Sequence, residues 1–73
     1  PSTIIEYQIP QGSFVNLTVY DMLGREVKTL VNENKGAGSY STELDGTNLP
    51  SGTYIYKIKA GDFTDTKKLV LIK

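Results

Sequence analysis

Apolar and polar residues alternate with a period of two along most of this chain. Val15, Leu17 and Val19 alternate with Asn16 and Thr18, and successive side chains of a strand point to opposite faces of a sheet. This segment is therefore predicted to be a half-buried strand. Strands are predicted in the same way for residues 4–9, 40–44, 54–59 and 63–73.

Short segments rich in glycine, proline and aspartate separate these strands. They lie at residues 10–12, 21–24, 45–52 and 60–62, and such residues favour turns. Turn signals at this spacing, with no helical periodicity, predict an all-β fold, a small antiparallel β-sandwich of six to seven strands.

Two stretches fit the pattern less well. In residues 25–31, Val27 and Leu30 are three residues apart, so strict alternation would place them on opposite faces of a third strand. A β-bulge in this strand would bring both to the same face. Residues 32–38 are polar and contain two glycines, so they are predicted to form the longest mobile loop.

The last predicted strand has no polar face at its end. Leu69 and Leu71 alternate with Val70 and Ile72, so both faces are apolar. A strand buried on both sides has this pattern, and so does a strand that awaits a partner surface. Both interpretations remain open from the sequence.

The chain has 73 residues, which is enough for one domain, residues 1–73. It has no cysteine and no histidine, so disulfides and a structural zinc site are excluded. The fold must rest on a dense core, to which five tyrosines and two phenylalanines contribute. Because the sequence opens on Pro1 rather than methionine, we expect a domain excised from the C-terminus of a larger secreted protein.

Charge is balanced overall but unevenly distributed. Residues 1–50 carry three basic and six acidic side chains, a net charge of −3, whereas residues 51–73 carry five and two, a net charge of +3. Zero net charge argues against nucleic-acid binding. The asymmetry is compatible with two solvated faces, or with a basic C-terminal hairpin that meets an anionic partner. No apolar run approaches the ~18 residues of a membrane span.

The residues do not suggest catalysis, and no cofactor is indicated. Without His or Cys the usual triads and thiol nucleophiles are excluded. Asp21, Asp45 and Asp62 lie in or beside glycine turns, where their side chains would bind the backbone. The protein is therefore predicted not to be an enzyme.

Three weaker motifs have simpler explanations. The Asp45–Asn48 cluster offers oxygen ligands for calcium but lacks the further acids of a full ligand loop. Asn16-Leu17-Thr18 matches a glycosylation sequon, although its position on a strand favours chance. Tyr54 and Tyr56 would suit a sugar-binding platform if exposed, but their spacing beside Ile58 favours the core.

Several motifs, in order along the chain, resemble the type A C-terminal sorting domain of the type IX (Por) secretion system. Those that carry the likeness are Tyr20-Asp21-Met22-Leu23-Gly24-Arg25, Gly38-Ser39-Tyr40, Pro50-Ser51-Gly52-Thr53-Tyr54, Gly61-Asp62-Phe63 and Lys67-Lys68-Leu69-Val70-Leu71-Ile72-Lys73. The likeness covers essentially the whole chain.

The resemblance implies a seven-stranded immunoglobulin-like sandwich on secreted cargo from Bacteroidetes and related bacteria. It implies recognition by an outer-membrane translocon, with removal by a sortase-like peptidase that attaches the cargo to the cell surface. The expected protein is a monomer joined to an N-terminal cargo domain, reaching its destination through the periplasm. The translocon-recognition candidates are Pro50, Gly52, Tyr54, Lys68, Leu69, Val70, Leu71, Ile72 and Lys73.

Another function remains open. The same turn and strand motifs occur in immunoglobulin-like spacers and carbohydrate-associated modules of multidomain secreted enzymes. A spacer should tolerate extra residues after Lys73, whereas a terminal sorting signal should not. Sugar binding would require an exposed aromatic pair at Tyr54 and Tyr56.

Overall fold

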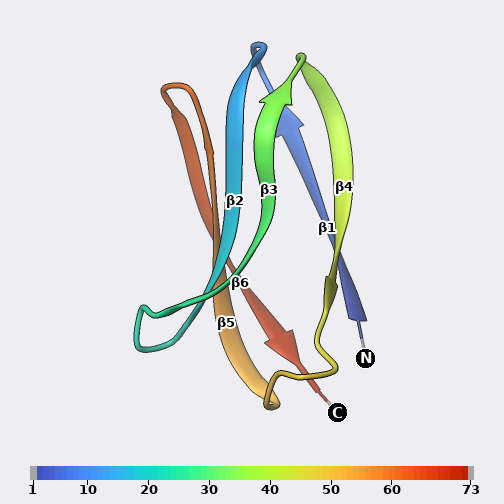
Figure 1. Cartoon of the computed structure of the whole chain (residues 1–73), viewed down its shortest axis with the longest axis vertical. Coiled ribbons are helices and arrows are strands. Elements are labelled where there is room, and N and C mark those ends of the chain that lie inside the picture. Colours follow the sequence, from blue (N-terminus) through green and yellow to red (C-terminus); the bar gives the residue numbers. More distant parts are fainter. Residues whose placement is uncertain (1, 73) are drawn as a thin grey trace.

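The computed structural model describes residues 2–72, and these form six antiparallel strands in two sheets (Figure 1). The strands are β1 (Ser2–Ile9), β2 (Ser13–Asp21), β3 (Glu26–Lys35), β4 (Gly38–Asp45), β5 (Gly52–Ala60) and β6 (Phe63–Leu71). The prediction of a small all-β sandwich is confirmed. Six strands, not the seven implied by the family resemblance, occur in the described part of the chain. It contains no helix long and apolar enough to cross a membrane.

The two sheets differ in width. β1 pairs with β4 in the smaller sheet, and the larger sheet has the order β3-β2-β5-β6. Because the strands run alternately up and down, β1 begins at the same end of the sandwich at which β6 ends (Figure 1). The β5–β6 hairpin turn lies at the opposite end.

The core lies between the two sheets. Val15, Leu17 and Val19 of β2 are fully buried together with Leu44 of β4. They are the inward positions that the period-two pattern predicts. Burying a side chain of this size contributes about 1.5–3 kcal/mol, so these four residues form the centre of a small core.

β3 is longer than the sequence suggested. Its pairing with β2 skips Leu30 and then Val27, so each is the extra residue of a β-bulge. The predicted bulge is confirmed, and both side chains pack against the core. The predicted mobile loop at residues 32–38 is wrong, because β3 continues to Lys35 and leaves only residues 36–37 between β3 and β4. Pairing with β2 from Ser13 onward holds this polar stretch extended.

β6 is an edge strand of the larger sheet. It joins β5 through a two-residue turn in which Gly61 has φ +61°, as type II′ hairpin turns require at their first position. The turn closes on a hydrogen-bonded pair, Ala60 and Phe63. Bonded and non-bonded pairs then alternate, so the backbone N–H and C=O groups of Thr64, Thr66, Lys68 and Val70 point away from β5.

Candidate recognition site

The two candidate motifs are almost twenty residues apart in sequence but pair in the structure. In the β5–β6 register Gly52 lies opposite Leu71, Thr53 opposite Val70, and Tyr54 opposite Leu69. The turn that carries Pro50 is therefore next to the last residues of β6. One end of the sandwich holds all the described recognition candidates in a single site.

Gly52 and Tyr54 shape the entry to β5. Gly52 has φ +151°, a conformation that side chains disfavour. The buried Tyr54 donates a hydrogen bond from its hydroxyl to the carbonyl oxygen of Pro50, at 2.6 Å. The entry to β4 repeats this arrangement, with Gly38 at φ +149° and the Tyr40 hydroxyl bonded to the Gly36 carbonyl at 2.7 Å. Both tyrosines thus fix the chain before their strands.

This burial removes the exposed aromatic pair that sugar binding at residues 54–56 would need. Tyr54 is 6% exposed, and Tyr56 is half-buried against the core. The interpretation of these two residues as core is confirmed.

The end of β6 has one buried and one exposed face, which settles its ambiguous pattern. Leu71 is 3% exposed and Leu69 is half-buried against the core. On the opposite face Val70 is 58% exposed, and Ile72, just beyond the strand, is 80% exposed. The interpretation as a strand buried on both sides is therefore wrong. Lys73 lies outside the described residues.

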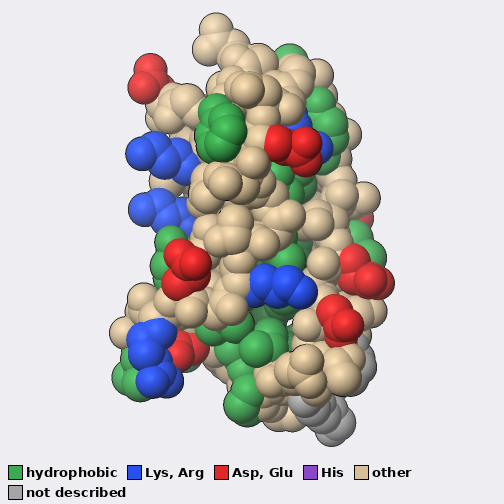
Figure 2. All heavy atoms as spheres, in the orientation of Figure 1, with side chains coloured by type: hydrophobic (Ala, Val, Ile, Leu, Met, Phe, Trp, Pro, Cys, Tyr) green, Lys and Arg blue, Asp and Glu red, His purple; other side chains and the backbone are tan. Residues whose placement is uncertain are grey.

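Three lysines share the outer face of the β5–β6 hairpin. Lys57 and Lys59 alternate with the inward residues of β5, and Lys68 lies opposite Ile55 on the same face. Within residues 2–72 none of the three forms an ion pair; the two ion pairs there are Arg25–Asp21 and Lys35–Glu33. In Figure 2, basic side chains project along the flank formed by β5 and β6. The outer face of the hairpin therefore carries positive charge without an internal partner.

The β2–β3 turn displays two apolar side chains that the sequence analysis treated only as turn residues. Leu23 is 78% exposed and Met22 is also exposed. Asp21 holds this turn: its carboxylate accepts hydrogen bonds from the backbone N–H groups of Leu23 and Arg25 and from Arg25 Nε, at 2.9, 3.0 and 2.8 Å. Asp21 also lies opposite Tyr54. The sequence does contain a signal for this exposure, because two large apolar residues lie between turn residues, where no strand can bury them.

We expect the contribution of Asp21 to stability to depend on pH. The backbone N–H of Arg25, then its guanidinium and the N–H of Leu23, lower the pKa of Asp21 below the ordinary value of an aspartate carboxyl. A lowered folded-state pKa means that the stabilisation is present above the unfolded pKa and lost as pH falls through the folded pKa. The free energy of unfolding of the wild type should thus exceed that of Asp21→Asn most above about pH 5, and the difference should shrink toward pH 2.

Denaturant titrations of both proteins at several pH values measure this difference. The carboxylate of Asp45, whose pKa is also lowered, is present in both proteins and cancels. A difference that stays constant from pH 7 to pH 2 would contradict the assignment of the effect to the ionised Asp21.

The remaining weak motifs have local structural explanations. Asp45 Oδ1 accepts hydrogen bonds from the backbone N–H and the hydroxyl of Thr47. Asn16 lies within β2, where its amide donates to Asn32 Oδ1 and its own Oδ1 accepts from the buried Thr18 hydroxyl. No cluster of three or more potential metal ligands of the His, Cys, Asp and Glu types occurs in residues 2–72.

A family model described as the secretion system C-terminal sorting domain matches residues 2–73, and this family consists of secretion signals rather than catalytic domains. No curated protein and no solved structure matches the chain. The chain belongs to the family of C-terminal sorting domains of the type IX secretion system, and the resemblance noted in the sequence is confirmed. Such a domain is attached to an N-terminal cargo and directs it, through the type IX machinery, across the outer membrane.

Proposed function

We propose that the type IX machinery recognises this domain at the end of β6 and the adjoining Pro50–Gly52 turn. The observation that supports this proposal best is that β6 is an edge strand whose last residues expose apolar side chains. A receptor strand adds to this edge through the outward backbone groups of Lys68 and Val70. Main-chain hydrogen bonds supply affinity, and the side chains at alternate positions supply selectivity.

Lysines on an edge strand also have a protective role, because charge discourages unwanted pairing. That role accounts for Lys67 and Lys68. It does not account for Val70 and Ile72, since protection favours polar residues where these two stand. Their exposure supports docking onto a partner surface.

The wider proposal follows the family. We infer that residues 1–73 are one monomeric, non-catalytic sorting domain at the C-terminal end of a secreted protein that passes through the periplasm. Cleavage by a sortase-like peptidase and attachment of the cargo to the cell surface follow export. Lys73 belongs to the proposed recognition edge by its place in the sequence.

The test is export of a periplasmic reporter fused to residues 1–73 in a host with the type IX machinery. The wild-type fusion should reach the medium or the cell surface. Val70→Pro should reduce export strongly, because proline removes an outward backbone donor without breaking the β5–β6 ladder. Export is measured as the fraction of reporter outside the cell, with unfolding midpoints as the check on folding.

Thr64→Pro is the matched control, because it makes the same change on the same edge at the hairpin end, far from the recognition site. It should be exported like the wild type. Equal export of both proline variants, at equal stability, would contradict recognition at the end of β6. Retention of the wild-type fusion would instead favour a passive spacer.

A further inference from the structure

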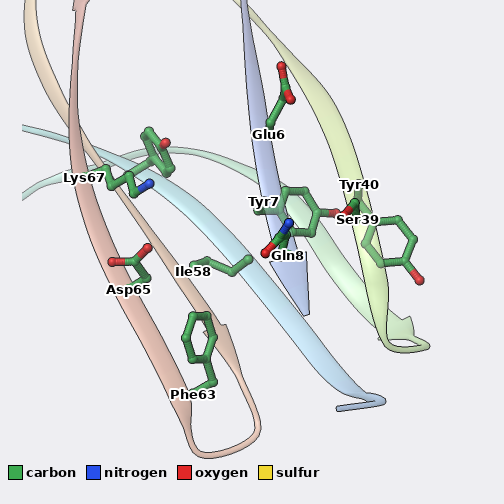
Figure 3. A pocket seen from close by; sticks show the side chains of 10 residues that line it. Glu6, Tyr7, Gln8, Ser39, Tyr40, Ile58, Phe63, Asp65 and Lys67 are labelled. Atoms are coloured by element: carbon green, nitrogen blue, oxygen red, sulfur yellow. The ribbon is translucent and has the colours of Figure 1, made fainter. Parts of the chain in front are cut away.

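The sandwich is closed on one side and open on the other. β3 and β4 contact each other across one side. On the opposite side β1 is the edge of the two-stranded sheet, and the wider sheet extends beyond it to β5 and β6. Figure 3 shows the resulting gap, with Tyr7 and Gln8 on one side and Ile58, Phe63 and Asp65 on the other.

This gap is a groove of about 370 Å³ with a mixed polar and apolar lining, whose apolar side chains lie at its floor. Tyr56, Ile58 and Phe63 contribute to the floor, and Phe63 is 38% exposed. The rim is charged: Glu6 lies on the β1 side, and Asp65 and Lys67 lie on the β6 side. A second hollow, which shares Gln8, Ser39 and Phe63 with the first, continues the groove to Pro10.

One wall of the groove is an unpaired strand edge. In residues 2–72, β1 pairs with β4 and with no other strand. Alternate backbone N–H and C=O groups of β1 therefore point away from β4, toward the groove. An unpaired edge beside an apolar floor is a template for an additional extended segment.

We propose that the connector that joins the cargo to Ser2 folds back along β1 and occupies this groove. Cargo is attached on the N-terminal side in this family, so the connector enters the domain beside β1. Once its path has reversed ahead of β1, it must cover about 13 Å, at about 3.3 Å per residue, to run from the level of Ser2 to that of Glu6. Its covalent attachment gives it a high effective concentration at the groove.

The geometry also indicates what the connector looks like. Its backbone bonds to β1, and apolar side chains at alternate positions lie on Tyr56, Ile58 and Phe63. Polar groups face Asp65 and Lys67 at the rim. A second copy of the domain does not fit, because antiparallel pairing of two β1 strands would place both wide sheets on the same side, each extending beneath the other's β1.

Hydrogen exchange on the complete cargo protein tests this proposal, with its natural connector or with a Gly/Ser connector of equal length. Amides of β1 that point away from β4, within residues 5–9, should exchange at least about tenfold faster with the Gly/Ser connector. Amides in the centre of β2 should exchange equally in both proteins and serve as the internal control. The readout is independent of export.

A second variant separates connector binding from general loosening. Phe63→Ala should accelerate exchange in residues 5–9 of the protein with its natural connector, and should have little effect once the Gly/Ser connector is present. Equal exchange with the two connectors would overturn the proposal. So would protection of β1 that appears only on addition of type IX machinery or a soluble glycan, since the groove would then belong to that partner.

Discussion

Deletion of residues 69–73 is expected to abolish export of an attached cargo completely. The deletion removes most of the proposed recognition edge. It also removes the buried Leu71 and the half-buried Leu69 from a small core. Measuring the exported fraction of a reporter fused to the shortened domain checks this result. Export at the wild-type level would contradict the assigned role of this segment.

Two single variants separate recognition from folding in this segment. Leu71→Ala should lower the free energy of unfolding by about 2–5 kcal/mol, as for other buried leucines. Ile72→Asp should change stability by no more than about 0.5 kcal/mol, because the side chain is exposed. If Ile72→Asp folds normally but is exported poorly, the edge is read directly. If it is exported normally, the Ile72 side chain is not read, and Val70→Pro then decides whether the backbone edge is.

Gly52→Val is expected to lower the free energy of unfolding by about 1–3 kcal/mol. The cause is backbone strain, because Gly52 has φ +151° while a Cβ there would meet no atom within 4 Å. Relief of this strain would disturb the pairing with Leu71 and the hydrogen bond from Tyr54 to Pro50. Stability is read from denaturant unfolding, and export from the same reporter.

Alanine substitutions supply the control for this prediction. Gly12 does not have a positive φ, and a Cβ there would meet nothing closer than 3.7 Å. Gly12→Ala should therefore be close to neutral, whereas Gly52→Ala should be destabilising. Equal stability of these two variants would show that the turn before β5 does not depend on glycine.

The period-two pattern predicted most of the fold because a strand that is buried on one face has an apolar residue at every second position. Val15, Leu17 and Val19 show this alternation without interruption, and they are fully buried. The polar residues 32–35 show no such alternation. Backbone pairing with β2 holds them in β3, and backbone hydrogen bonds are insensitive to side-chain polarity.

Candidate recognition residues could be named from the sequence, but the sequence could not show how they are arranged. That Pro50 and the end of β6 lie together depends on the β5–β6 register, which the two-residue turn at Gly61 sets. The buried and exposed faces of residues 69–72 cannot be told apart from the sequence, because aliphatic residues occupy both faces and do not reveal which one meets the core. The exposure of Met22 and Leu23 was not predicted, because Asp21 and Gly24 are sufficient to explain a turn there without reference to the two apolar side chains.

β1 begins at the same end of the sandwich at which β6 ends. A cargo domain fused directly to Ser2 would therefore lie next to the surface that the type IX machinery is proposed to recognise. A large cargo domain would cover that surface, and a small one would leave it accessible. The exported fraction should then rise with the length of the linker before Ser2, until the cargo no longer covers the recognition surface and a longer linker has no further effect.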